Sequence, residues 1–117
     1  MHELSISEAV VDTVVKHAAG RRVALVSMTT GALRQVVPES LEFYFEIVAR
    51  DTVCAGARLE QTRVAARLGC ACGTEWEPEI PAFRCPSCGG ADVEVVAGDE
   101  LEVESIELEE TECIARP

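Results

Sequence analysis

Residues 69–92, GCACGTEWEPEIPAFRCPSCGGAD, limit the kinds of fold that this chain can adopt. The stretch is rich in cysteine, glycine and proline, and its apolar residues follow neither the helical nor the strand period. A segment this short buries too little apolar surface to fold unaided. We therefore interpret residues 69–93 as a small module that is inserted between two strands of one sheet and held together by a bound metal.

The four cysteines of this stretch predict a tetrahedral metal site. Cys85 and Cys88 form a C-x-x-C knuckle, and Cys70 and Cys72 form a second close pair upstream of it. Four thiolates repel one another unless a dication neutralises them, and metal binding contributes about 10–16 kcal/mol to folding in small zinc modules. Four protein ligands leave no open position for catalysis, so we expect structural Zn(II).

The spacing of the first pair leaves other interpretations open. Cys70 and Cys72 are spaced C-x-C, so one of them could be a bystander while another residue completes the site. Iron is the chief rival metal, because four thiolates also hold iron in rubredoxin-like sites. A redox role for Cys85 and Cys88 is less favoured, since thioredoxin-like motifs open a helix and this pair is flanked by Pro and Gly. The two remaining cysteines, Cys54 and Cys113, are expected to be ordinary thiols.

Outside the module, the sequence predicts an α+β domain formed by residues 1–68 and 94–117. Apolar residues at helical spacing predict two helices, and runs rich in β-branched residues predict three strands. The helices are expected at 5–20 and 38–52, and the strands at 21–31, 57–68 and 99–110. In the third strand the apolar parity changes near Ser105, which indicates a bulge or burial on both faces.

The ends of the helices carry their own signals. Ser5 and Glu8 fit a capping box, Gly20 suits the left-handed position after a helix, and Pro38 suits the first helical position. The expected buried stripe of the first helix is Ile6, Val10, Val14 and His17 or Ala18. The expected buried stripe of the second helix is Leu41, Tyr44, Phe45 and Val48.

The overall composition excludes several classes of function. The chain has 117 residues, of which 48% are hydrophobic, so it suits one domain or one domain with a small module. Ten Lys and Arg against 21 Asp and Glu give a net charge of −11, which argues against a nucleic-acid partner. No stretch approaches the roughly 20 apolar residues of a membrane span, and the start does not resemble a signal peptide. We therefore expect a cytoplasmic protein whose cysteines are thiols or metal ligands.

The first three residues offer a second set of metal ligands. The amine of Met1 and the backbone nitrogen and imidazole of His2 can close five- and six-membered chelate rings on one ion, and the amide or carboxylate of Glu3 can take the fourth place. Such a nitrogen-rich planar site favours Ni(II) or Cu(II). His17 is expected to cap or pack against its helix, and Glu39 is a weak candidate for an extra ligand.

The stretches MHELSI, VVPESLEFYFE and GDELEVESIE, together with the paired cysteines, resemble the HypA/HybF family. These accessory proteins deliver nickel to [NiFe]-hydrogenase. The resemblance implies two helices packed on a three-stranded sheet, with a zinc-ribbon-like domain inserted before the last strand. It implies nickel at Met1, His2 and Glu3 and zinc at the cysteines Cys70, Cys72, Cys85 and Cys88. The family usually has C-x-x-C at the first cysteine pair, where this chain has C-x-C.

The resemblance also implies partners and a mode of action. The partners are a nickel-handling GTPase accessory protein and the large subunit of [NiFe]-hydrogenase. Neither a nucleic acid nor a membrane is expected as a partner. The chain itself would be a monomer or a weak homodimer. We expect a transferable Ni(II), a structural Zn(II) and no enzymatic activity, because no nucleophile–base pair or phosphate-binding loop is evident. The alternatives are a zinc-ribbon module that binds protein or nucleic acid, and a rubredoxin-like iron–thiolate electron carrier.

Overall fold

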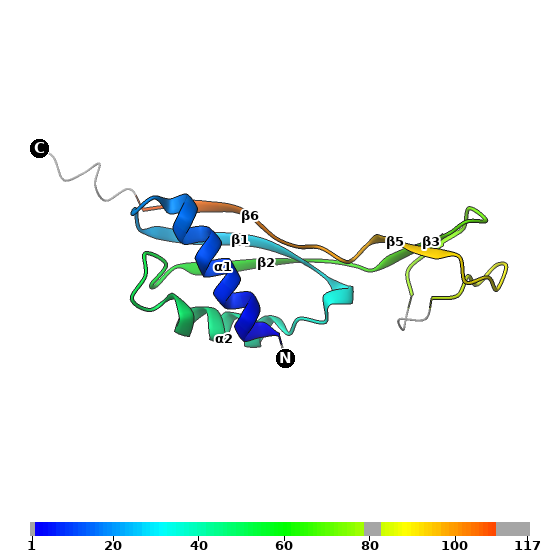
Figure 1. The fold of residues 1–117 in the computed structure, drawn as a ribbon, viewed down its shortest axis with the longest axis horizontal. Coiled ribbons are helices and arrows are strands. Elements are labelled where there is room, and N and C mark those ends of the chain that lie inside the picture. The colour runs from blue at the N-terminus through cyan, green and yellow to red at the C-terminus, as the bar shows by residue number, and fades with distance from the viewer. Residues whose placement is uncertain (1, 79–82, 110–117) are drawn as a thin grey trace, which may run out of the picture. The chain divides into compact units, whose positions relative to one another are not determined.

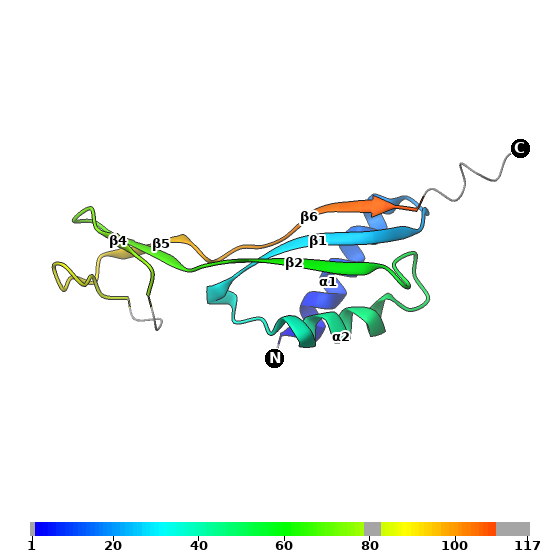
Figure 2. The ribbon, with the colours of Figure 1, turned by 180° about the vertical axis from the view of Figure 1, so that it is seen from behind.

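A computed structural model describes residues 2–78 and 83–109 of the chain. Within these residues, two α-helices and six strands follow one another, with a single 3₁₀ turn, η1 (Figures 1 and 2). Their bounds are α1 Glu3–Ala18, β1 Val23–Gly31, η1 Ala32–Arg34, α2 Pro38–Ala49, β2 Arg58–Val64, β3 Arg67–Cys70, β4 Glu75–Trp76, β5 Val93–Ala97 and β6 Leu101–Leu108. The strands form two sheets of three, ordered β2-β1-β6 and β4-β3-β5.

The chain forms two compact units. The first, here called the helical unit, contains α1, α2 and most of the β2-β1-β6 sheet; it comprises Val36–Gln61 and the described residues before Thr29 and after Glu102. The second, here called the cysteine unit, comprises Thr29–Gln35 and Thr62–Glu102 and contains the β4-β3-β5 sheet. The predicted zinc-binding segment 69–93 lies wholly within the cysteine unit. The functional division of the chain that we drew from the sequence stays a prediction.

The core of the helical unit is formed by aliphatic side chains from both helices and the sheet. Leu41 of α2 is fully buried, and Phe45 one turn later is 2% exposed. The hydroxyl of Ser7 on α1 donates to the Leu41 carbonyl at 3.3 Å, so a buried polar contact joins the two helices. The other buried apolar residues of this unit are Val10, Val11, Val14, Ala18, Val23, Val26, Met28, Val36, Ala49, Cys54 and Leu59. Two helices on a three-stranded sheet are thus confirmed.

The start of α1 differs from the prediction. The helix begins at Glu3, its N-cap is His2, and no side chain caps it, so the capping box of Ser5 and Glu8 is wrong. The cause is a tertiary contact: Glu3 accepts a hydrogen bond from the backbone N–H of Val37, which fixes the first turn two residues earlier. Tertiary contacts of this kind commonly override a local capping preference.

The buried stripes follow the predictions with small shifts. In α1, Ser7 is buried where Ile6 is half-buried, and Ala18 rather than His17 faces the core. After the helix both Ala19 and Gly20 have positive φ values, of 52° and 85°. Helix α2 starts at Pro38 as predicted and ends at Ala49. Its stripe has Leu41 and Phe45 buried, with Tyr44 and Val48 half-buried.

The predicted single strand 57–68 is wrong, because this stretch forms parts of two strands. Strand β2 ends at Val64, and β3 begins at Arg67 in the other sheet. Strand β3 pairs antiparallel with both β4 and β5; Leu68 lies opposite Trp76 on one side and Val95 on the other. The short strands β4 and β5, and with them this whole second sheet, were not predicted from the sequence.

A close backbone contact holds the cysteine unit together where its segments meet. Gly31 donates to the Glu100 carbonyl at 2.7 Å, and Leu33 donates to the Gly98 carbonyl at 2.8 Å. A Cβ on Gly31 would overlap the Gly98 carbonyl, and a Cβ on Gly98 would lie 2.5 Å from the Cα of Ala66. Gly98 also has φ +104°, which L side chains rarely adopt. Both glycines are therefore needed for the backbones to approach.

We predict that Gly98→Ala destabilises the cysteine unit by about 3 kcal/mol or more, since it combines backbone strain with overpacking. Gly73→Ala is the matched control, because Gly73 has a similar φ of +99° but open space around the added Cβ. It should cost only the conformational penalty, about 1–2 kcal/mol. Urea denaturation followed by the fluorescence of Trp76, which lies in this unit, measures both. Equal losses would show that the steric contact is unimportant.

Candidate metal centres

The four cysteines of the cysteine unit converge on one point. All four sulfurs lie within 4.8 Å of one another. The Cys70 and Cys88 sulfurs are 3.6 Å apart, as are those of Cys72 and Cys85. A tetrahedral ion with metal–sulfur bonds of about 2.3 Å separates its ligand sulfurs by about 3.8 Å. The arrangement therefore suits a four-thiolate site with both members of the C-x-C pair included.

The first cysteine pair is positioned by a tight turn at the end of β3. Cys70 is the last residue of that strand, and its N–H donates to the Thr74 carbonyl at 2.8 Å. Its carbonyl in turn accepts from the Gly73 N–H at 2.8 Å. The Cys72 sulfur lies 3.4 Å from the Thr74 hydroxyl. This turn presents two sulfurs from a C-x-C spacing, which explains how the shorter pair reaches the same point.

The second cysteine pair lies in a knuckle whose amides point at sulfur. The N–H groups of Ser87 and Cys88 both lie 3.4 Å from the Cys85 sulfur, and the Gly90 N–H lies 3.4 Å from the Cys88 sulfur. The loop is closed by the Gly89 N–H, which donates to the Cys85 carbonyl at 2.9 Å. Amide donors of this kind stabilise thiolates and orient them as metal ligands. The described residues 83–92 form no helix, which disfavours a thioredoxin-like redox site.

The thiols influence one another's ionisation strongly. Hydrogen bonding to Thr74 lowers the pKa of Cys72 to about 6, and the N–H groups of Cys88 and Ser87 lower the pKa of Cys85. The Cys72 amide favours the Cys70 thiolate, yet burial and the neighbouring thiols raise the pKa of Cys70 to about 12. The protein thus favours some thiolates at this point but not all four. A dication that bound there would supply the missing positive charge.

The remaining cysteines lie outside this cluster. Cys54 is fully buried in the helical unit, and burial raises the pKa of its thiol. This agrees with the prediction of an ordinary buried thiol. Cys113 lies outside the described residues.

The predicted nickel site begins outside the described residues, because Met1 is not among them. His2 is exposed and precedes α1, and its carbonyl accepts from the Ile6 N–H at 2.9 Å. Glu3 is only 4% exposed, and its Oε2 accepts from the Val37 N–H at 3.1 Å. The terminal ammonium and the Val37 amide hold the pKa of Glu3 down, at about 2. Glu3 therefore has a structural role in addition to its predicted role as a ligand.

The two weaker candidates do not join a ligand cluster. His17 is exposed in the last turn of α1, and its Nδ1 lies 2.8 Å from the Thr13 carbonyl one turn earlier, so the ring packs against its own helix rather than capping its end. Glu39 is exposed in the first turn of α2. Among the described residues, the four cysteines are the only group of three or more metal-binding side chains that could share an ion.

Comparison with known proteins identifies the family. A family model described as "Hydrogenase/urease nickel incorporation, metallochaperone, hypA" matches residues 1–108. The chain belongs to the HypA family. Members of this family are nickel-incorporation metallochaperones rather than catalysts, so a non-enzymatic role is consistent with the match.

Individual relatives support the assignment over almost the full chain. The hydrogenase maturation factor HypA of Geobacter metallireducens is 44% identical over 110 residues, which cover 93% of this chain and 100% of the relative. That of Streptomyces avermitilis is 41% identical over 116 residues, covering 94% of this chain and 88% of the relative. The HypA family fold is also present in the solution structure of the Ni metallochaperone HypA from Helicobacter pylori, with 22% identity and a TM-score of 0.69. That match covers 92% of this chain and 97% of the other.

Neither of the two described helices is long and apolar enough to cross a lipid bilayer.

The geometry predicts that Cys72 is a full ligand despite the C-x-C spacing. Cys72→Ser should lose most bound metal when the purified protein is dialysed against a weak chelator. Replacing the metal with Co(II) in the parent protein should give the intense thiolate-to-cobalt absorption of a four-sulfur site, and the variant should show a weaker band. Cys54→Ser is the control and should behave as the parent. If the Cys72→Ser variant keeps the parent's metal content and spectrum, Cys72 is not a metal ligand.

Proposed function

We propose that this protein is a nickel metallochaperone that binds Ni(II) through Met1, His2 and Glu3 and delivers it during maturation of [NiFe]-hydrogenase. Its membership of the HypA family carries the proposal. The proposal also includes a structural Zn(II) bound by the four cysteines. The domain assignment follows: residues 1–68 and 94–117 bind nickel, and residues 69–93 bind zinc.

The terminal nickel site is supported by the position of His2. The residue is exposed and precedes the first turn of α1, where the backbone N–H groups have no acceptor within the helix. Its amide nitrogen can therefore be ionised by a metal without breaking a helical hydrogen bond. The amine of Met1, the amide of His2 and the imidazole of His2 together provide three nitrogens for a planar ion, the geometry that Ni(II) favours.

The backbone nitrogen of Glu3 is the better candidate for the fourth donor. The alternative donor, the Glu3 carboxylate, is 4% exposed and is held by the Val37 amide. A carboxylate that turned toward an ion at the exposed His2 would leave the part-buried Val37 N–H without its acceptor, which costs free energy. Nickel ligation by the Glu3 backbone leaves the contact with Val37 in place.

The four-cysteine site plays a structural part in this proposal. A closed four-thiolate site retains its ion, whereas a cargo ion must be released. The described part of the cysteine unit buries only two apolar residues, Leu68 and Cys85, so it needs the metal to stay folded. The same need argues against a transferable ion at the cysteines. An iron–thiolate carrier is the second candidate for this site alone, and it would be red when purified.

The partners that we propose are those of the family: a nickel-handling GTPase accessory protein and the hydrogenase large subunit. The family description also names urease as a recipient of nickel. A net charge of −11 gives no support for nucleic-acid binding.

The terminal chelate predicts that nickel affinity depends on the free amine and on His2. A version with one extra residue before Met1 and a His2→Ala variant should both lose high-affinity nickel in calorimetric titrations. Both should keep their zinc, measured by elemental analysis. The control is His17→Ala, which removes the other histidine and should titrate as the parent. If both altered termini bind nickel like the parent, the terminal site is wrong.

The contact between Glu3 and Val37 makes the fourth donor testable. Planar Ni(II) is diamagnetic, so amide signals stay visible in a ¹H–¹⁵N spectrum of the nickel-loaded protein. We expect the Ile6 amide, which bonds to the His2 carbonyl, to shift on loading, while the Val37 amide keeps its position. A large upfield shift of Val37 would mean that the carboxylate has left it for nickel, which would contradict backbone ligation by Glu3.

A further inference from the structure

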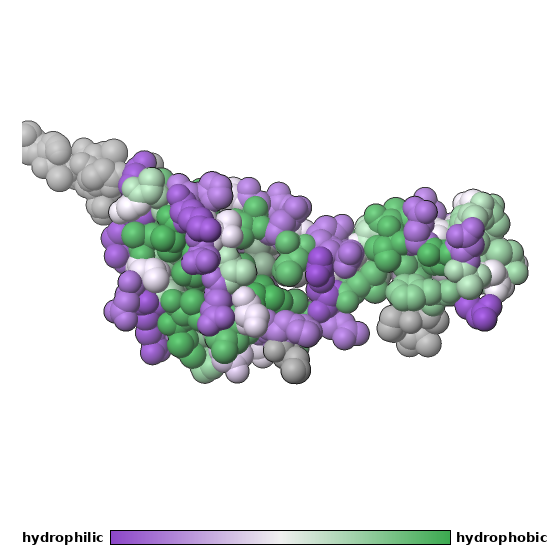
Figure 3. Space-filling view, in the orientation of Figure 1, coloured by the Kyte–Doolittle hydropathy of each residue, from purple (hydrophilic) through white to green (hydrophobic). Residues whose placement is uncertain are grey.

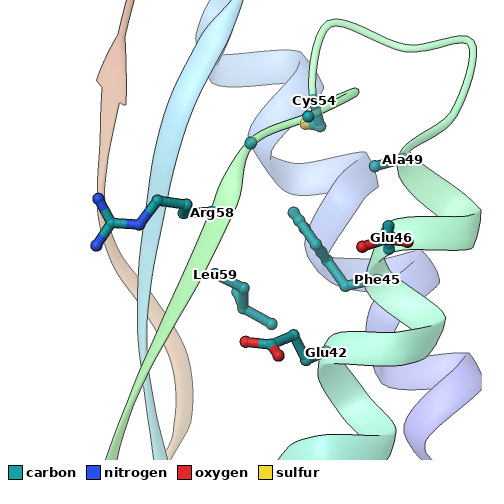
Figure 4. A pocket seen from close by; sticks show the side chains of 9 residues that line it. Glu42, Phe45, Glu46, Ala49, Cys54, Arg58 and Leu59 are labelled. Atoms are coloured by element: carbon teal, nitrogen blue, oxygen red, sulfur yellow. The ribbon is translucent and has the colours of Figure 1, made fainter.

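A pocket lies beside α2 in the helical unit, away from both proposed metal sites in the sequence. It has a volume of about 370 Å³ and opens between α2, the loop after it and the start of β2 (Figure 4). Its walls include Phe45, Ala49 and Leu59, and the buried thiol of Cys54 closes one end. Pockets of about 300–1,000 Å³ are the usual size for sites that enclose a small ligand or an anchoring side chain.

Two carboxylates lie at the mouth of this pocket. Glu42 and Glu46 are one turn apart on α2 and both line the pocket, and Figure 4 shows the Glu42 side chain directed into the space between α2 and β2. Within the described part of the chain neither side chain has an ion-pair or hydrogen-bond partner. The one cation of the lining, Arg58, points away from the pocket, and its guanidinium lies 3.7 Å from Glu60. The pocket therefore presents an apolar wall and unneutralised negative charge.

The helix carries an exposed apolar ridge next to these carboxylates. Phe43 is 61% exposed and Ile47 is 38% exposed, and the two are one turn apart. Each directly follows one of the pocket carboxylates, so on a helix the ridge runs alongside the acidic row. Figure 3 shows apolar residues on this face of the helical unit, interrupted by polar ones. Exposed aromatic side chains beside a pocket are typical of protein-binding surfaces.

We propose that this pocket receives an arginine side chain from a basic, amphipathic segment of a protein partner. The aliphatic stem and planar guanidinium would pack against Phe45 and Leu59, while the head would pair with Glu42 and Glu46. Apolar residues of the same segment would cover Phe43. Arginine is among the residues that most often anchor protein interfaces.

Charge complementarity selects this occupant over the others. A second copy of the chain carries a net charge of −11 and would be repelled, as would a nucleic acid. A metal ion is disfavoured because, among the described residues, only the four cysteines form a group of three or more metal-binding side chains that could share one. The inference concerns docking and is independent of where nickel binds.

The pocket can be tested in the zinc-loaded full-length protein with a minimal probe. N-acetyl-arginine amide should shift the ¹H–¹⁵N signals of Ala49, Gly56 and Ala57, which line the pocket. N-acetyl-norleucine amide, an uncharged apolar probe, and MgCl₂ at matched ionic strength should leave them in place. Equal shifts with the norleucine probe would show that the pocket binds apolar groups without regard to charge. Equal shifts with Mg²⁺ would show that it attracts any cation. Either result overturns the proposal.

Charge-neutralising variants locate the interaction. The double variant Glu42→Gln/Glu46→Gln should weaken arginine-amide binding at least about fivefold, because both charged partners of the guanidinium are lost. The matched control, Glu8→Gln, alters an exposed helical glutamate of α1 that is not part of the pocket and should bind as the parent. Parent-like binding by the double variant would overturn the proposal.

A peptide probe tests the ridge. An alanine-based helical peptide with arginine and leucine four residues apart should bind more tightly than arginine amide. Phe43→Ser should weaken the peptide at least about fivefold and leave arginine amide unchanged, because Phe43 lies beside the pocket rather than in its lining. If the peptide binds no better than arginine amide, or if Phe43→Ser does not weaken it, the apolar ridge takes no part in binding the partner.

Discussion

The convergence of four sulfurs within 4.8 Å is the constraint on which the cysteine unit depends. A short β4-β3-β5 sheet and a few turns enclose little apolar surface, and among the described residues only Leu68 and Cys85 of this unit are buried apolar side chains. Segments with so small a core need a cross-link or a metal to fold. Backbone amides point at the sulfurs of Cys85 and Cys88, and hydrogen bonding to Thr74 lowers the pKa of Cys72, so the surroundings of these sulfurs suit metal ligands.

The proposed function makes a different demand on the helical unit, because the residues before α1 would have to be held in a defined place. The unit meets this demand with a conventional core and one polar contact. The Glu3 carboxylate binds the Val37 amide, which ties the first turn of α1 to the residue before α2. The contact leaves His2 exposed immediately outside the helix. In the proposed function, a rigid helix thus carries a cargo site that remains accessible, and the ion can be removed without disturbing the core.

The sequence predicted the features that depend on spacing and failed where distant segments decide the outcome. Both helices and the approximate positions of β1, β2 and β6 follow from apolar pattern, although the second strand was drawn too long, and the cysteine cluster follows from two close pairs. The capping box failed because the Glu3–Val37 contact, which spans 34 residues, determines where α1 starts. Strands β4 and β5, of two and five residues, were missed because runs so short show no clear period.

The pocket beside α2 could not be predicted for the same reason. Its walls come from residues 42–49 and 54–59, which face one another only after the chain reverses through the loop between them. The sequence did assign Phe45 to the core, but it gave no reason to expect the carboxylate of Glu42 to border a cavity. The one related signal in the sequence was Phe43, an aromatic residue that lies off the buried stripe of Leu41 and Phe45.

Helix α2 links the two proposed activities of the helical unit. Its start is held by Glu3 through Val37, and its side carries the pocket. Coupling between the two would require α2 to have two positions that nickel and the partner prefer differently. The full burial of Leu41, the 2% exposure of Phe45 and the bond from Ser7 argue for a single position. On these grounds α2 serves as a fixed platform, and in the proposed function nickel release would follow from competing ligands on the recipient rather than from movement of the helix.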